Sequence, residues 1–210
     1  MEGYVSENEQ LESFKQWWKK YGKLVTAGVV LGVAALAGGQ WWRHNQTVQA
    51  EAASAEYQQL VAGLTKNNAQ VVQERASRII SQYSSTPYAA FAALALAKTK
   101  LDQGDSKSAR TQLQWVLDHS DQPGVQNIAR LRLARILFSE GQNAPALATL
   151  NAVESGDFAT QYEELKGDIQ IALGKPAEAR AAYTKALAAL EPGAAERAQL
   201  QMKLDDVGAK

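Results

Sequence analysis

The 210-residue sequence predicts an all-α protein in which a single N-terminal transmembrane helix precedes a solenoid of helical repeats. Three observations lead to this prediction. Residues 24–42 carry no charge, the chain after Arg43 has helical periodicity with almost no strand-like alternation, and one pattern of small and large residues recurs three times.

The composition narrows the functional class. The chain holds 22 basic and 22 acidic residues and no cysteine. Residues 1–42 contain four Lys and four Glu, which leaves 18 charges of each sign for the rest. A nucleic-acid-binding protein would carry a clustered basic excess, so we expect no nucleic-acid partner. Without cysteine there is no disulfide, thiolate nucleophile or Cys-based metal site.

The uncharged run at residues 24–42 predicts the membrane span. As a helix rising about 1.5 Å per residue, it is just long enough to cross a hydrocarbon core of roughly 30 Å. Trp17 and Trp18 precede it, and Trp41 and Trp42 close it, as expected of aromatic belts at both interfaces. A helix buried in a soluble core is the weaker alternative, because the run is apolar all round and rich in glycine.

The flanking cations predict the orientation. Four Lys precede the span, whereas only Arg43 follows it before Lys66. The positive-inside rule then places residues 1–23 in the cytoplasm and residues 43–210 on the far side. A cleaved signal peptide is the alternative, since Ala35-Leu36-Ala37 resembles a cleavage site, although a long acid-containing leader is atypical of such a peptide.

Two features suggest contacts at the membrane. Leu11, Phe14, Trp18 and Tyr21 recur at helical spacing, so residues 1–23 are expected to include an amphipathic helix that lies on membrane lipid or docks on a partner. Within the span, Gly28 and Gly32 form a GxxxG pair that would let another membrane helix approach closely.

The repeat appears when Gly104, Gly141 and Gly174, which are 37 and 33 residues apart, are aligned. A small residue lies seven before each glycine, Ala five after it, a large residue nine after it and an apolar residue twelve after it. In that order they are Ala97, Ala109, Leu113 and Val116; Ala134, Ala146, Leu150 and Val153; and Gly167, Ala179, Tyr183 and Ala186. Small residues and a turn glycine allow two antiparallel helices to pack closely.

This pattern resembles a degenerate tetratricopeptide repeat, which lacks the family's Trp here. The resemblance implies a tetratricopeptide-like helical-repeat solenoid. Single helix pairs cannot bury their apolar faces, so we expect a divergent first pair at 49–64 and 69–83. Residues 194–207 would form a capping helix with Glu196, Arg197, Lys203 and Asp205 turned outward. An irregular helical bundle is the alternative.

In tetratricopeptide folds the first helix of each pair lines a concave surface, which predicts a protein-binding groove here. The register places nine residues on it: Phe91, Leu94, Lys98, Leu131, Arg135, Phe138, Glu164, Asp168 and Ile171. The alternative is that Phe91, Leu94, Leu131 and Phe138 simply pack between helices.

Neither a catalytic site nor a cofactor or metal site is predicted. The two histidines, His44 and His119, are too far apart for any known metal spacing, and no P-loop, GxGxxG or GxSxG motif is present. We expect a protein that is not an enzyme, although an unrecognised site stays an alternative.

The whole chain also resembles the YfgM-type ancillary subunits of the bacterial Sec translocon. The resemblance is carried by five segments: Met1-Glu2-Gly3-Tyr4, the Gly-rich span from Gly28 to Gly39, Ser54-Ala55-Glu56-Tyr57, Leu131-Arg132-Leu133-Ala134-Arg135 and Gln201-Met202-Lys203.

This resemblance implies a bitopic inner-membrane protein whose C-terminal domain is periplasmic. It also implies three kinds of partner: the Sec translocon, a membrane-anchored periplasmic chaperone of the prolyl-isomerase class, and exported client proteins. The expected function is a non-enzymatic adaptor that passes exported proteins to chaperones. The alternative is a scaffold in another envelope-biogenesis complex.

Overall fold

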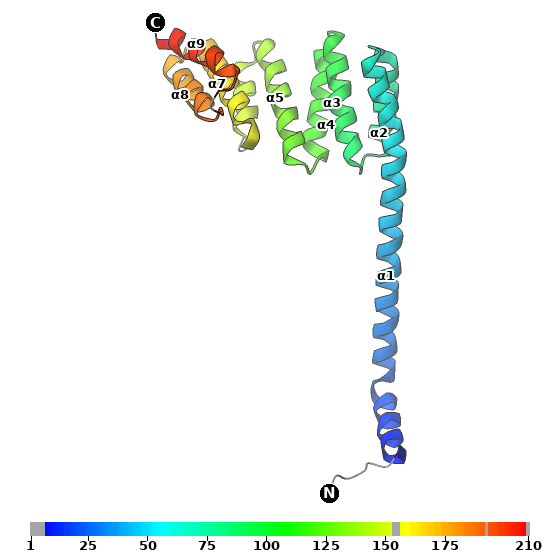
Figure 1. Cartoon of the computed structure of the whole chain (residues 1–210). Helices are drawn as coiled ribbons and strands as arrows, with labels where there is room; N and C mark the ends of the chain where they lie inside the picture. Colours follow the sequence, from blue (N-terminus) through cyan, green and yellow to red (C-terminus); the bar gives the residue numbers. More distant parts are fainter. Residues whose placement is uncertain (1–6, 153–155, 192, 209–210) are drawn as a thin grey trace. The chain divides into compact units, whose positions relative to one another are not determined.

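A computed structural model describes residues 7–152, 156–191 and 193–208 (Figure 1). The Met1-Glu2-Gly3-Tyr4 segment and Val153 of the second repeat copy lie outside these residues. The chain forms two compact units, Met1–Gln49 and Ala50–Lys210. The described residues are helical apart from turns, and they include no strand, which confirms the predicted all-α class.

The first unit consists of the N-terminal part of helix α1, which extends from Glu7 to Thr65. Its apolar stretch is long enough to cross a membrane, and only 6% of that stretch is buried. This apolar stretch is therefore not the core helix of a soluble domain. The sequence predicted separate helices at 24–42 and 49–64, but the structure joins them into one helix because residues 43–48 contain neither Gly nor Pro.

The second unit is a row of antiparallel helix pairs. After the C-terminal part of α1 the helices are α2 (Ala69–Gln82), α3 (Pro87–Asp102), α4 (Ser106–His119), α5 (Pro123–Ser139), α6 (Asn143–Asn151), a 3₁₀ turn η1 (Gly156–Phe158), α7 (Ala159–Ala172), α8 (Pro176–Ala188) and α9 (Glu196–Gly208). From α2 onward, each helix packs mainly on the helix next to it in sequence.

The turns of the three recognised pairs form at the predicted glycines. Gly104, Gly141 and Gly174 have φ values of 79°, 74° and 71°, a left-handed conformation that strains other residues. The first pair turns without glycine, because Asn67 takes a positive φ of 50° and the Asn68 side chain accepts a hydrogen bond from the Val71 amide.

The small and large residues of the repeat form the core. Ala97, Ala109, Ala134, Ala146 and Ala179 are buried, and Leu113, Leu150 and Tyr183 pack beside them. Gly167 takes the small position of the third pair, where a Cβ atom would overlap the Tyr183 ring. This arrangement confirms the predicted repeat register and excludes an irregular bundle for the described residues.

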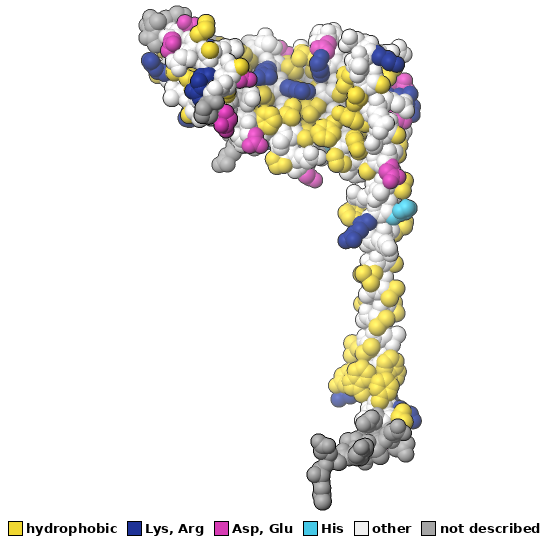
Figure 2. Space-filling view, viewed as in Figure 1, with side chains coloured by type: hydrophobic (Ala, Val, Ile, Leu, Met, Phe, Trp, Pro, Cys, Tyr) yellow, Lys and Arg dark blue, Asp and Glu magenta, His cyan; other side chains and the backbone are white. Residues whose placement is uncertain are grey.

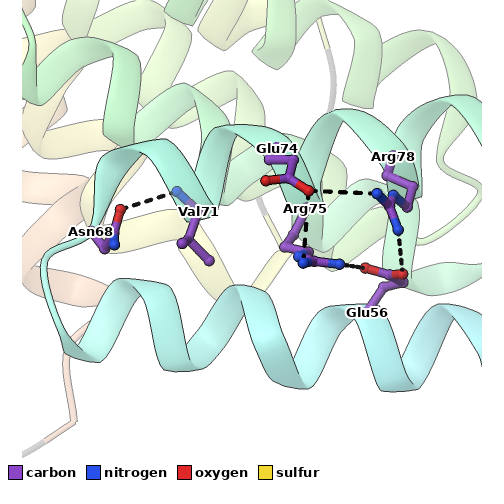
Figure 3. Close-up of polar contacts among 6 residues, drawn as sticks. All are labelled: Glu56, Asn68, Val71, Glu74, Arg75 and Arg78. Atoms are coloured by element: carbon purple, nitrogen blue, oxygen red, sulfur yellow. Dashed lines mark hydrogen bonds and ion pairs between the residues drawn. The ribbon is translucent and has the colours of Figure 1, made fainter.

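Charged side chains join the first pair at its surface (Figure 3). Glu56 on α1 accepts hydrogen bonds from Arg75 at 3.0 Å and Arg78 at 3.1 Å, both on α2. Arg78 also pairs with Glu74 at 3.5 Å. The hydrogen bond from Arg75, supported by Arg78, lowers the pKa of Glu56.

Candidate protein-binding groove

Two of the predicted site residues of the second and third pairs, Lys98 and Arg135, meet at a groove between α3 and α5. Its volume is about 440 Å³, and we call it the α3–α5 groove. It is lined by Ala97, Lys98, Leu101, Leu113, Arg132, Arg135, Ile136 and Ser139. Lys98 and Arg135 were predicted to share a surface and do line the same groove, because each lies six residues before the turn glycine of its pair. Figure 2 shows hydrophobic side chains with basic side chains beside them over α3 and α5.

Three cations dominate the charge of this groove. Lys98 pairs with Asp102 on its own helix at 2.6 Å. Arg132 donates a hydrogen bond to the backbone carbonyl of Leu94 at 3.4 Å. No ion pair to Arg132 or Arg135 is formed by any carboxylate in the part of the chain that the structure describes. Partial burial, reinforced by the neighbouring Arg135 charge, lowers the pKa of Arg132.

The two predicted leucines are core residues. Leu94 is 7% exposed and Leu131 is 6% exposed, and both belong to the main hydrophobic cluster of the second unit. For these two the packing alternative is correct. Phe91 and Phe138 are half-buried and pack against the same cluster, so each leaves part of its ring at the surface.

Phe91 belongs to an aromatic cluster that the sequence analysis missed. The ring of Tyr57 on α1 lies 6.3 Å from that of Phe91 and 5.5 Å from that of Tyr88, both on α3. Helical spacing on α3 places Tyr88 and Phe91 on one face. Tyr57 lies more than thirty residues earlier, in a helix pair whose turn has no glycine, so the glycine alignment does not relate it to α3.

In the last pair, the two predicted acidic site residues already accept hydrogen bonds from other side chains of the same unit. Lys203 on α9 donates to Glu164 at 2.8 Å and to both Asp168 carboxylate oxygens at 2.8 and 2.9 Å. Tyr183 donates to Asp168 at 2.7 Å. Burial opposes the charge on Lys203, but the bonds to Asp168 and Glu164 outweigh it and raise the pKa of Lys203. Ile171 is the exposed member of this set, at 44%.

The predicted outward orientation of α9 is therefore wrong for two of its four charges. Glu196 and Asp205 are exposed as expected. Lys203 instead points to α7, and Arg197 donates to the Leu187 and Leu190 carbonyls at the end of α8. Leu200, which is 1% exposed, turns this side of α9 toward α8.

In the first unit, Gly28 and Gly32 lie four residues apart on one face of α1. A Cβ atom added at either position would meet no other atom within 4 Å, so this face is open. Before them, Phe14, Trp17, Trp18 and Tyr21 form a chain of neighbouring rings with centroids 6.0 to 6.3 Å apart. This aromatic face has the spacing of the predicted amphipathic segment.

No group of three or more metal-ligating residues is found among the described residues. His119 is exposed at the end of α4 and stacks on Trp115 with ring centroids 4.4 Å apart. Its Nδ1 also lies 2.9 Å from the Trp115 carbonyl oxygen. Both contacts are to Trp115 on the same helix, so they give His119 a structural role at the end of α4.

Known proteins match this chain over nearly its whole length. Residues 15–209 match the family described as "Tetratricopeptide repeat-like domain". An Escherichia coli K12 protein named "Ancillary SecYEG translocon subunit" is 30% identical over 208 residues, or 99% of each chain. Proteins of the same name from Haemophilus influenzae and Neisseria gonorrhoeae are 31% and 29% identical, and they cover 87% and 99% of this chain and 89% and 100% of their own lengths.

Proposed function

The chain belongs to the tetratricopeptide repeat-like family of ancillary SecYEG translocon subunits, and from this premise we propose that it is a non-enzymatic ancillary subunit of the Sec protein translocon. The observation that carries the proposal is the nearly full-length match to relatives of that name. The match includes both the apolar helix and the repeats, so it extends beyond a shared repeat fold.

The proposed topology places residues 1–23 in the cytoplasm, 24–42 in the inner membrane and 43–210 in the periplasm. Its support is the lysine excess before the span. A phosphatase reporter that is active only in the periplasm, fused after Lys210, should therefore be active. The mature protein should keep its N-terminus, and a mature form that begins at Gly38 would identify a cleaved signal peptide instead.

The proposed role is that of an adaptor between exported proteins and a membrane-anchored periplasmic chaperone of the prolyl-isomerase class. The resemblance described above suggests this role, and the repeat face supplies a surface for it. Anchoring raises the local concentration of the α3–α5 groove near the membrane, so weak binding to each client would suffice. Gly28 and Gly32 would provide the face of the span that contacts another membrane helix.

Site-specific photocrosslinking tests these proposals together. A photoreactive residue replaces Val29 in the span, Ser139 in the α3–α5 groove or Lys185 on the exposed side of α8, and adducts are identified by mass spectrometry. We expect translocon adducts from at least one of these positions and exported proteins from Ser139 but not from Lys185. Adducts only to proteins of another envelope assembly would support the alternative scaffold function.

A further inference from the structure

The α3–α5 groove combines positive charge with apolar walls. Arg132 and Arg135 come from α5, while Leu101, which is 43% exposed, comes from α3. Ala97, Leu113 and Ile136 complete the apolar lining. A ligand for this groove must therefore offer apolar contacts and at least one anionic group.

Arg132 and Arg135 are exposed, and they differ in their partners from the partly buried cations that connect helices elsewhere in the second unit. Arg75 meets Glu56, Arg110 meets Glu140 at 3.2 Å, and Lys203 meets Glu164 and Asp168. Arg132 has the Leu94 carbonyl as its partner instead, and Arg135 forms no ion pair with any described residue. The donors of Arg135 and most of those of Arg132 therefore point to solvent or to a partner.

A carboxylate is the group that suits these donors best. A guanidinium binds a carboxylate through two parallel hydrogen bonds, and such charge-assisted bonds are stronger where water is partly excluded. An anion between the two side chains would also relieve the repulsion that the neighbouring charges exert on each other. Lys98 adds a third cation at the edge of the same groove, although Asp102 partly neutralises it.

We propose that the α3–α5 groove binds an acidic side chain within an apolar segment of an exported protein. This inference rests on the proposed function and adds the chemistry of the client. The acidic residue would lie between Arg132 and Arg135, while an adjacent apolar residue would contact Leu101. An internal segment fits better than a chain terminus, because the partly exposed rings of Phe91 and Phe138 extend the apolar surface of α3 and α5 beyond the groove.

Peptide binding to the full chain in micelles of a non-ionic detergent tests the proposal. The probe is a fluorescent, N-acetylated and C-amidated peptide in which Glu alternates with Leu, and its matched partner carries Gln in place of Glu. Blocking both ends removes any contribution from a terminal carboxylate. Fluorescence anisotropy should show the Glu peptide binding about tenfold or more tightly than the Gln peptide, with the difference shrinking as salt is added.

Variants locate the effect. Arg135→Glu should abolish the preference for the Glu peptide, and Arg135→Gln should reduce it, with no change in thermal unfolding because the Arg135 side chain is exposed. Lys185→Glu removes an exposed cation from α8 and should keep the full preference.

Three outcomes would overturn the inference: equal binding of the two peptides, no binding of either peptide, and equal losses in Arg135→Glu and Lys185→Glu. Copurification of the same variants with the translocon separates this inference from the function on which it rests. If the wild-type chain shows no preference for the Glu peptide but still copurifies with the translocon, only the acidic specificity is contradicted. A wild-type chain that does not copurify contradicts the ancillary-subunit function itself.

Discussion

The junction of α3 with α5 and the junction of α7 with α9 use equivalent helix positions but treat charge in opposite ways. Lys98 and Asp168 both lie six residues before a turn glycine. In the last pair, Lys203 reaches back from α9 and binds the carboxylates of α7. In the middle of the repeats, Arg132 reaches back from α5 to a carbonyl of α3.

The ion pairs between α7 and α9 stabilise the fold, whereas we propose that the arginines of α5 bind a partner. Breaking the α7–α9 junction leaves two half-buried carboxylates without their cation, which costs stability. At the α3–α5 junction the arginines complete no ion pair among the described residues, so changing one should alter binding rather than folding. If the proposed client binding is correct, equivalent repeat positions serve the fold in one pair and a partner in another.

The largest expected loss of stability comes from a substitution in the last helix pair. Ala97 and Ala134 fill the small position of their pairs, but Gly167→Ala would force a methyl group into the Tyr183 ring. We expect a loss of about 3 kcal/mol in the free energy of unfolding, measured with urea on the full chain in non-ionic micelles.

Two variants control this prediction. Adding Tyr183→Leu to Gly167→Ala recreates the Leu found at the equivalent positions Leu113 and Leu150, and should recover part of the loss. Gly124→Ala, near the start of α5, adds a methyl group with no atom within 4 Å and should be neutral or slightly stabilising. Similar losses at both glycines would contradict the steric explanation.

A smaller effect is expected when the charge of the C-terminal junction is removed. Lys203→Gln leaves Glu164 and Asp168 facing each other, and should lower the free energy of unfolding by about 1 to 2 kcal/mol. Arg135→Gln, in the middle of the repeats, should not change it. The proposed division between structural and binding charge fails if urea unfolding ranks these variants in the opposite order.

The first pair offers a charge contact whose contribution depends on pH. The pKa of Glu56 is lowered from its ordinary 4.5 by Arg75, so its stabilisation is complete above that value and disappears as pH falls through the folded-state pKa. Glu56→Gln should therefore cost about 1 kcal/mol at neutral pH and nothing in strong acid. A cost that stays constant with pH would show that Glu56 acts by packing alone.

The smallest effect on folding is expected in the span. Gly28→Leu combined with Gly32→Leu should leave the unfolding of the second unit unchanged, because a Cβ atom at either glycine would meet no described atom within 4 Å beyond the nearby backbone of its own helix. Copurification with membrane partners in mild detergent should decrease, since the leucines keep a partner helix at a distance. Val29→Leu with Val33→Leu is the matched control, and equal copurification of both double variants would remove the glycine face from consideration.

The sequence was informative where the local chemistry decides the structure. Gly104, Gly141 and Gly174 could be identified because each turn between two helices needs a residue that tolerates a left-handed backbone. The first helix pair could be predicted because the repeats need a neighbour to cover their apolar face. Arg132 was missed although its neighbours at 131 and 135 were selected. Its position depends on how far α5 rotates against α3, which the periodicity of one helix does not determine.

The same reason explains the error at the C-terminus. Lys203 has the composition of a solvated residue, and only the packing of Leu200 and Leu204 on α8 turns it toward α7. Whether the groove binds a client is not written in any motif of the chain. The proposed binding depends on Arg132 and Arg135, and only the three-dimensional structure shows that no carboxylate among the described residues pairs with them.

The packing of each helix on its neighbour in sequence also has a consequence for the order in which the second unit is made. From α2 onward each helix makes its main contacts with a helix that is adjacent to it in the sequence. Loop-closure entropy is therefore small at every step, and folding can proceed pair by pair. If the second unit is exported as the proposed topology requires, it can begin to fold while its C-terminus is still passing through a channel, and α9 packs last.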